Sequence, residues 1–254
     1  KIENMSLIIR EIKAKSILTK SGIPGVDYCI NPYVGCSHGC RYCYATFMKR
    51  YTGHTAAWGS FVDVKINAPE ILQKQLKRAK RGRVMISSVT DAYQPIESKY
   101  RLTRQCLEAL LQYQFPVDIL TKSPLVLRDT DLIKKFKDIE VGITITTHDE
   151  KISRVFEPNA PSIIARIRTL KTLHDNRIKT YAFIGPVLPM NPEALSEKIN
   201  PHVDSIIIDR MNYPSKTFTI YNRMNLSKWL DKDFIDDIIQ RLKNGFAGKP
   251  VTIC

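Results

Sequence analysis

Short runs of apolar and β-branched residues recur along this chain, and a helical pattern follows each of them. Such a run followed by an amphipathic segment is typical of a βα unit, and repeated βα units build a parallel sheet. Some runs, such as Ser205-Ile206-Ile207-Ile208, are almost continuously apolar, which indicates strands covered on both faces. The six runs span residues 28–34, 84–89, 117–121, 141–147, 180–184 and 205–209.

The segments between the runs carry helix start and stop signals. Asn67 and Glu70 predict a capping pair for a helix that Gly82 ends. Asn191 and Pro192 predict the cap and the first position of a helix that ends at residue 199. Further helices are expected over residues 102–113, 131–137, 162–175 and 230–245.

Six strands are too few for an eight-stranded closed barrel, so we expect an α/β fold that forms an open, partial (β/α)6 barrel with a parallel sheet. Its chemistry belongs at the carboxyl ends of the strands, where the βα loops meet. We expect an N-terminal segment over residues 1–24, the barrel over residues 25–212 and a short C-terminal helical extension over residues 213–254.

Composition and charge narrow the class of protein. The chain is 43% hydrophobic and 25% charged, which excludes disordered, collagen-like and coiled-coil chains. No apolar run approaches the roughly 18 residues of a membrane span, and residues 1–20 lack the apolar centre of a signal peptide, so we expect no membrane partner and a cytoplasmic location.

The formal net charge is +14, which favours a polyanionic partner such as nucleic acid. The densest basic stretch runs from Lys74 to Arg83. A charge run of this kind is also typical of a solvated helix face, so it does not decide the partner alone.

Three cysteines crowd into the loop after the first run, in Cys36-Ser37-His38-Gly39-Cys40-Arg41-Tyr42-Cys43. Disulfides among them would strain tight loops, whereas thiolates are natural ligands of iron–sulfur clusters. Three soft ligands with no fourth cysteine nearby leave one metal position open, which marks a reactive site. A structural zinc completed by His38, or three unrelated buried cysteines, are the alternatives.

These residues resemble the radical S-adenosylmethionine (SAM) enzymes, whose C-x3-C-x2-C signature follows the first strand of a six-stranded partial barrel. Over about residues 25–212 the chain is similar to the branch of that superfamily related to spore photoproduct lyase. The similar segments are Asn31-Pro32-Tyr33-Val34-Gly35-Cys36 through Cys43-Tyr44-Ala45, Ser87-Ser88-Val89-Thr90-Asp91, Arg154-Val155-Phe156-Glu157-Pro158 and Pro186-Val187-Leu188-Pro189.

The resemblance implies a four-iron four-sulfur (4Fe-4S) cluster held by Cys36, Cys40 and Cys43, with SAM on the fourth iron. One electron, from a donor such as flavodoxin or ferredoxin, releases a 5′-deoxyadenosyl radical that abstracts hydrogen from a substrate. The protein positions the reactants and keeps the radical from water. Tyr44, beside the third cysteine, is a further candidate catalytic residue, and we expect the enzyme to be a monomer.

Polar groups just past the runs are candidates to hold SAM. Lys122 can pair with the methionine carboxylate, because a Lys at the inner rim needs an anionic partner, and the resembling branch has a Lys there. Hydroxyl groups for the amino group and ribose, an aromatic ring near the adenine and a proline that shapes its pocket complete the set: Ser87, Ser88, Thr90, Thr146, Thr147, Tyr42 and Pro186. Each Ser or Thr could equally cap a turn.

Other residues carry weaker predictions. Cys29 and Cys106 are expected in the core. His148 is a candidate proton donor or substrate ligand, although a lone loop His is more often neither. Arg154 and Glu157 are expected to form an ion pair that braces the site.

One position departs from the resembling branch. Spore photoproduct lyase returns hydrogen to the repaired thymine from a cysteine in the loop after its second strand, and Ser88 stands at that place here. An O–H bond is far harder for a carbon radical to break than an S–H bond. Thymine-dimer reversal therefore does not carry over directly, and Tyr44, Tyr93 or Cys254 becomes the alternative hydrogen source. Cys254 is also a candidate for a second cluster.

Two classes of function fit the sequence. In the first, the enzyme repairs or modifies a base of DNA or RNA, which the net charge and the aromatic residues Tyr44, Tyr51, Trp58 and Tyr93 favour, because flipped bases stack on such rings. In the second, the substrate is a peptide, a protein or a small metabolite. A non-enzymatic electron-transfer protein is disfavoured, because the three-cysteine site leaves an iron open.

Overall fold

A computed structural model describes residues 7–254. The chain divides into two compact units, one made of residues 1–39 and 45–140 and the other of residues 40–44 and 141–254. The domain boundaries expected at residues 24 and 212 stay a prediction, and residues 1–6 of the expected N-terminal segment lie outside the described residues. None of the helices over residues 7–254 combines the length and the apolar character that a bilayer-spanning segment needs.

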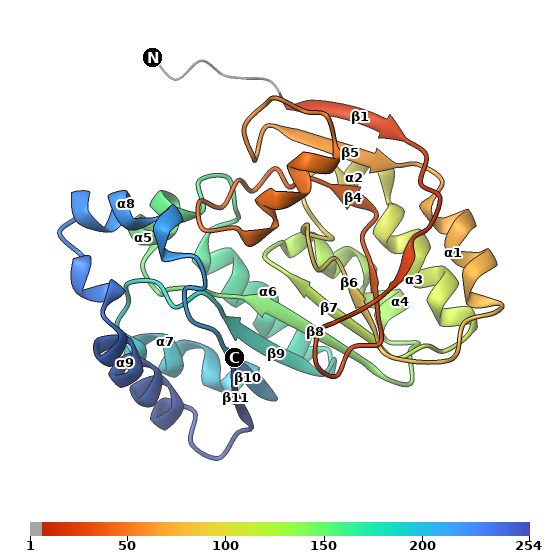
Figure 1. Ribbon diagram of the computed structural model, residues 1–254. Helices are drawn as coiled ribbons and strands as arrows, with labels where there is room; N and C mark the ends of the chain where they lie inside the picture. Colours follow the sequence, from red (N-terminus) through yellow and green to blue (C-terminus); the bar gives the residue numbers. More distant parts are fainter. Residues whose placement is uncertain (1–6) are drawn as a thin grey trace. The chain divides into compact units, whose positions relative to one another are not determined.

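The first unit contains two small sheets. In one, β2 runs antiparallel to β3, and β6 and β7 follow β3 in parallel. In the other, β5 pairs in parallel with β1 and antiparallel with β4. The helices α1, α3 and α4 lie together on one side of this unit (Figure 1). Its elements are β1 (Ile8–Ile12), β2 (Leu18–Lys20), β3 (Tyr28–Ile30), β4 (Tyr33–Val34), the 3-10 helix η1 (Tyr44–Tyr51, whose first residue belongs to the second unit), β5 (Phe61–Lys65), α1 (Ala68–Leu76), β6 (Val84–Ile86), α2 (Glu97–Tyr100), α3 (Leu102–Gln112), β7 (Val117–Thr121), η2 (Pro124–Asp129) and α4 (Thr130–Ile133).

The second unit has one parallel sheet in the order β8-β9-β10-β11. Helices α6 and α7 pack against each other, and α9 packs on α7 (Figure 1). Its elements are β8 (Ile139–Thr144, whose first two residues belong to the first unit), α5 (Glu150–Phe156), α6 (Ile163–Asp175), β9 (Thr180–Ile184), α7 (Pro192–Ile199), η3 (Asn200–His202), β10 (Ser205–Ile208), η4 (Pro214–Lys216), α8 (Phe218–Arg223), η5 (Ser227–Leu230), α9 (Lys232–Gly245) and β11 (Val251–Ile253).

Several predicted elements are confirmed to the residue. The third and fifth runs are β7 and β9 with the expected bounds. The helix over residues 192–199 is α7, and the Asn191 side chain accepts a hydrogen bond from the Ala194 amide at 2.9 Å, as a cap does. At these places a strong local signal, such as an apolar run or an Asn-Pro pair, is sufficient to predict the bounds of the element.

The first predicted strand is wrong as a single element. It breaks into β3 and β4, which belong to different sheets. Pro32 lies at the break, and a proline has no amide hydrogen to donate to a ladder. The Asn31 carbonyl instead accepts a hydrogen bond from Lys65 at 2.8 Å, so the chain turns and Tyr33–Val34 pairs with β5.

The helix before the second run also differs from expectation. Asn67 makes no side-chain cap and clasps the Ala14 backbone with two hydrogen bonds of 2.8 and 3.1 Å. Helix α1 ends at Leu76, six residues before Gly82. Continuing it would stack like charges four residues apart, Lys74 on Arg78, which destabilises a helix.

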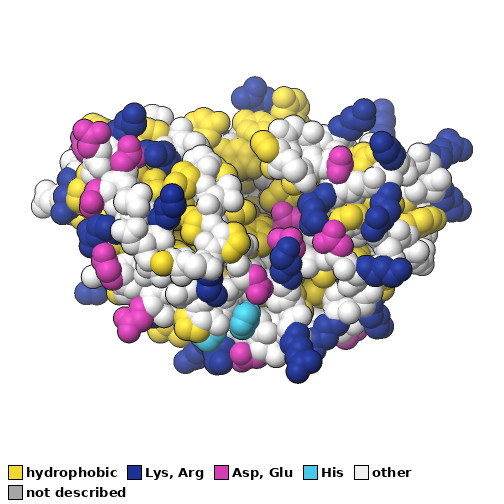
Figure 2. All heavy atoms as spheres, turned by 90° about the horizontal axis from the view of Figure 1, so that it is seen from below, with side chains coloured by type: hydrophobic (Ala, Val, Ile, Leu, Met, Phe, Trp, Pro, Cys, Tyr) yellow, Lys and Arg dark blue, Asp and Glu magenta, His cyan; other side chains and the backbone are white. Residues whose placement is uncertain are grey.

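The basic stretch from Lys74 to Arg83 is therefore not a helix face, because most of it follows α1 as turn and coil up to the start of β6. On the face drawn in Figure 2, Lys and Arg side chains are spread among Asp and Glu rather than gathered into one patch. On this face the positive charge is thus distributed rather than concentrated.

The remaining differences between the predicted and the observed elements are strands that the sequence did not predict and helices that are shorter than expected. β1 is mostly exposed, and Asp63 interrupts the apolar pattern of β5. The helix expected over residues 131–137 shrinks to the four-residue α4, and the last helix begins at Lys232. The C-terminal extension is not purely helical, since β11 joins the sheet beside β10.

Candidate functional site

The cysteine loop is held against the segment that leads into β5. Gly35 has a φ of 88°, and a Cβ there would lie 2.5 Å from the Phe61 carbonyl oxygen. A Cβ on Gly59 would lie 2.8 Å from the Gly39 Cα. Both approaches exclude any larger residue, so glycine is required for the loop to wrap this closely.

The three cysteines of the loop are divided between the two compact units. Cys36 belongs to the first unit, whereas Cys40 and Cys43 belong to the second. Cys36 and Cys40 are buried and Cys43 is half-buried. Over residues 7–254, neither unit by itself gathers three His, Cys, Asp or Glu side chains into a group that could hold a metal ion.

Gln94 fastens the cysteine loop through both ends of its amide. Its Oε1 accepts from the Ser37 amide at 3.0 Å, and its Nε2 donates to the Gly35 carbonyl at 3.2 Å and to Thr90 Oγ1 at 2.9 Å. The Thr90 hydroxyl donates to the same Gly35 carbonyl at 2.6 Å. Its one hydrogen is used there, so Thr90 holds the loop, and its expected contact with SAM stays a prediction.

Asp91 connects the same loop to the end of β7. Its carboxylate accepts hydrogen bonds from Thr121 Oγ1 at 2.6 Å and from the Lys122 amide at 2.9 Å. The same carboxylate lies 3.5 Å from Nδ1 of the buried His38. Asp91 therefore fixes the backbone of Lys122, and sequence reasoning did not assign it a role.

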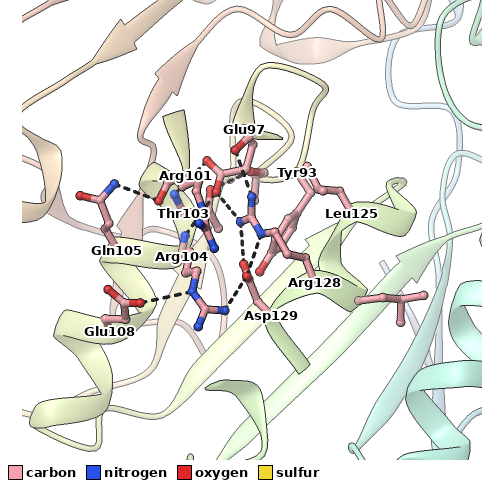
Figure 3. Close-up of polar contacts among 12 residues, drawn as sticks. Tyr93, Glu97, Arg101, Thr103, Arg104, Gln105, Glu108, Leu125, Arg128 and Asp129 are labelled. Carbon is pink, nitrogen blue, oxygen red and sulfur yellow. Dashed lines mark hydrogen bonds and ion pairs between the residues drawn. The ribbon is translucent and has the colours of Figure 1, made fainter. Parts of the chain in front are cut away.

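Glu97, three residues beyond Gln94, anchors the strand before the loop. It lies in a cluster of ionic contacts with Arg128, Asp129 and Arg104 (Figure 3). It is fully buried, accepts a hydrogen bond from Tyr33 of β4, and pairs with Arg128 at 2.8 Å. Arg128 also pairs with the buried Asp129 at 2.8 Å, which Arg104 of α3 contacts at 2.9 Å. Each buried carboxylate thus has a charged partner, without which its burial would be costly.

We call residues 91–97 the clamp. Through Asp91, Gln94 and Glu97 it contacts the cysteine loop, the strand that precedes that loop and the segment that carries Lys122. No sequence motif predicts the clamp, because each of its contacts joins residues far apart in the chain.

Ser87 has an unusual backbone conformation. Its φ is 68°, a left-handed value that is costly for a residue with a Cβ. It is 5% exposed, and over residues 7–254 its hydroxyl has no hydrogen-bond partner. A buried hydroxyl without a partner at the carboxyl end of β6 is available to a ligand. Ser88 beside it is half-buried and accepts from the Asn31 side chain at 3.3 Å.

Tyr42, in the second unit, is held by a buried ion pair. Its hydroxyl donates to Glu157, whose carboxylate lies 2.5 Å from Arg166 of α6. Glu157 and Arg166 are both fully buried, whereas Arg154 is exposed. The expected Arg154–Glu157 pair is therefore wrong, because burial places the charge of Arg166, not of Arg154, beside the carboxylate.

The threonines after β8 are fully buried and use their hydroxyls within the chain. Thr146 donates to Glu157 at 3.2 Å, and Thr147 donates to the Pro189 carbonyl at 2.7 Å. Both therefore brace loops, and their expected contacts with SAM stay predictions. Pro186, expected to shape the adenine pocket, lies buried in the loop after β9.

The other cysteines and His148 are placed as follows. Cys29 and Cys106 are buried, as predicted, and burial raises the pKa of the Cys106 thiol. Cys254 is exposed, and its amide extends the ladder from β10 at 3.0 Å. His148 Nδ1 accepts from the Asn191 amide at 3.1 Å, which connects it to the start of α7, and desolvation lowers the pKa of the ring.

The aromatic residues expected to stack on bases divide into two groups. Tyr93 is fully buried, so its ring does not face solvent, whereas Trp58 is half-buried and in a T-shaped contact with Phe61. Tyr44 and Tyr51 are exposed.

Comparisons with known proteins cover most of the chain. The sequence pattern of the radical SAM superfamily matches residues 30–199. An uncharacterized protein of Methanocaldococcus jannaschii is 39% identical over 252 residues, which cover 94% of this chain and 95% of that protein. A radical SAM Nα-GlyT isomerase of Pseudomonas phage M6 is 26% identical over 62% of this chain and 32% of its own length.

Solved structures share the fold. A spore photoproduct lyase with a dinucleoside spore photoproduct has a TM-score of 0.72 at 14% identity, covering 98% of this chain and 82% of that one. Streptococcus suis SuiB bound to the precursor peptide SuiA has a TM-score of 0.57 at 14% identity, covering 98% and 49%. The predicted fold class is confirmed: an α/β arrangement with a mostly parallel sheet that does not close into a barrel.

Proposed function

The chain belongs to the radical SAM superfamily, and on that premise we propose that it cleaves SAM reductively at a 4Fe-4S cluster and abstracts hydrogen from a nucleic acid. The observation that supports this most is the cysteine loop: three thiols within eight residues, fastened by the clamp whose Asp91 also fixes Lys122. Family membership makes the chain an enzyme, and the substrate is the proposed part.

The described residues suit both groups. Three thiols are the donor set of a cluster that keeps one iron open for SAM. The Ser87 hydroxyl, buried and without a partner over residues 7–254, suits a polar ligand. When bound, the cluster and SAM supply the hydrogen-abstracting radical. The residues that would hold the cluster are Cys36, Cys40 and Cys43, and those that would contact SAM are Lys122, Ser87, Ser88, Tyr42 and Pro186.

Different residues of the chain would bind SAM, hold the loops of the site and contact the substrate. The Lys122 ammonium would neutralise the SAM carboxylate, from a backbone that Asp91 fixes. Thr90, Thr146 and Thr147 hold loops of the site through their donated hydrogens, and their hydroxyl oxygens would accept from the SAM amino group or ribose. Tyr44, which is 45% exposed beside the third cysteine, is the group that meets the substrate.

Nucleic acid is the proposed substrate, because the net charge of +14 attracts a polyanion. The reaction class is repair or modification of a base in DNA or RNA. Ser88 in place of a thiol requires a hydrogen source unlike that of spore photoproduct lyase, or a reaction that needs none. We place the enzyme in the cytoplasm, where reduced thiols persist and flavodoxin or ferredoxin can donate the electron.

Anaerobic reconstitution tests the first part of the proposal. Iron and sulfide analysis with electron paramagnetic resonance should show one redox-active 4Fe-4S cluster, and product analysis should show 5′-deoxyadenosine and methionine after reduction with SAM. Replacing Cys36, Cys40 or Cys43 by Ala should abolish the cluster, whereas Cys106→Ala should keep it. Stoichiometric zinc without a cluster signal would sink the proposal.

The alternative substrate is a peptide, which SuiB of the same fold binds as its precursor. Deuterium transfer separates the two. If deuterium from a labelled oligonucleotide appears in 5′-deoxyadenosine, the substrate is a nucleic acid. If it appears only from a labelled peptide, the second class of function holds.

A further inference from the structure

The 3-10 helix η1 begins directly after the third cysteine and exposes aromatic rings. Phe47 is 39% exposed and Tyr51 is 71% exposed. The Arg50 guanidinium lies between them, with Cζ 5.9 Å from the centroid of each ring. Large apolar surfaces gathered in one exposed place mark binding sites. We call Phe47, Arg50 and Tyr51 the η1 platform.

The segment that carries the η1 platform is positively charged. No Asp or Glu occurs between Asp27 and Asp63, a stretch that includes Lys49 and Arg50. Asp63 itself is occupied by Arg10 and His54, each at 2.7 Å. Lys49 donates to the Thr55 carbonyl at 2.8 Å and Arg50 to the Phe47 carbonyl at 3.2 Å, and within residues 7–254 neither forms an ion pair. Both charges are therefore available to an anion.

We infer that the η1 platform binds unpaired bases of a nucleic acid strand, with the rings of Phe47 and Tyr51 as stacking surfaces and with Lys49 and Arg50 on phosphates. Stacking on aromatic rings beside cations is the general mode of single-strand binding. An intact duplex offers no free base face to such rings, so the occupant is a single strand or a flipped nucleotide.

The spacing of the rings fits an extended strand. Phe47 and Tyr51 are four residues apart, which in a 3-10 helix corresponds to about 8 Å of rise. Bases stacked on each other lie only about 3.4 Å apart. Each ring therefore receives its own base, and the guanidinium between the rings faces the intervening backbone.

This inference rests on the proposed nucleic acid function and narrows it to unpaired nucleotides. The test uses the reconstituted enzyme and a fluorescent single-stranded oligonucleotide that contains 2-aminopurine, whose emission is quenched on stacking. Phe47→Ala and Tyr51→Ala should each weaken binding at least about fivefold, the lower end of measured base–aromatic stacking, and should relieve the quenching. A duplex of the same sequence should bind more weakly to the wild-type enzyme and respond less to either substitution.

Two control variants isolate the ring. Tyr51→Phe keeps the stacking face and should bind within about twofold of wild type. Tyr113→Ala removes another exposed aromatic ring, at the end of α3 and ahead of β7, and should also bind as wild type does. Equal loss in Tyr51→Phe and Tyr51→Ala would overturn the stacking role.

The outcomes separate the two proposals. Wild-type enzyme that binds single strands, with Phe47→Ala and Tyr51→Ala unchanged, overturns the η1 platform alone. Wild-type enzyme that binds no oligonucleotide, or that binds a peptide in preference, overturns the nucleic acid function and the η1 platform together.

Discussion

Asp91, Gln94 and Glu97 stand three residues apart in the sequence, and each reaches a different part of the site. Asp91 fixes Lys122, Gln94 fixes the cysteine loop and Glu97 fixes the strand before it. An amide such as Gln94 has no signature of its own, because its role is set by partners more than fifty residues away. The cysteine spacing, in contrast, is local and can be recognised in the sequence.

Gln94→Ala should destabilise the chain by about 1–3 kcal/mol, because it leaves the part-buried Ser37 amide and the buried Gly35 carbonyl without that partner. Urea denaturation of the cluster-free protein measures this. Gln105→Ala, an amide on the exposed side of α3, is the matched control and should change the free energy of unfolding by no more than about 0.5 kcal/mol. Equal stability of both variants would contradict the role of the clamp.

The residue types at the site were predictable from the sequence, but the hydrogen-bond or ion-pair partner of each residue was not. Thr90, Thr146 and Thr147 lie where hydroxyls for SAM were expected, yet all three donate to groups of the chain. Glu157 was expected to pair with Arg154, and burial selects Arg166. These choices depend on packing between elements, which periodicity and spacing do not contain.

Among the elements, those with strong local signals were predictable and those defined by tertiary contacts were not. β7, β9 and α7 have the expected bounds. β5 was missed because Asp63, paired with Arg10, interrupts its apolar pattern.

The ion pair between Arg166 of α6 and Glu157, the residue after α5, gives a prediction at the scale of elements. Arg166→Leu leaves the Glu157 carboxylate buried without a charged partner, so the free energy of unfolding should fall by about 3–5 kcal/mol. The exposed pair of Arg241 with Glu193 supplies the control, and Arg241→Leu should cost no more than about 1 kcal/mol, since water screens that pair. Denaturant unfolding of both variants decides it, and similar losses would show that Glu157 is not held by Arg166.

For the whole molecule, the alternation of apolar runs and helices was enough to predict an open, mostly parallel α/β fold, which the shared fold with solved structures confirms. The division into two units was not predictable, because the boundary passes through the cysteine loop, between Gly39 and Cys40. Within the first unit, the basic stretch precedes β6, whereas Ser87 and the clamp follow it. These charges lie at the amino end of the strand, away from the proposed site.

The position of the basic stretch ahead of β6 leads to a prediction for the binding of nucleic acid. If the chain binds nucleic acid, affinity should fall with salt by a log–log slope of about −0.7 to −0.9 per phosphate contacted. Reversing Lys77, Arg78 and Arg81 to Glu removes phosphate contacts, so binding should weaken for every sequence and the slope should become shallower. SAM cleavage should not change, because a contact at the amino end of β6 positions the polyanion without touching the reacting groups. Filter binding to single-stranded and duplex DNA and RNA at two salt concentrations measures both quantities, and weak binding that is insensitive to salt for all four ligands would move the substrate to a peptide or metabolite.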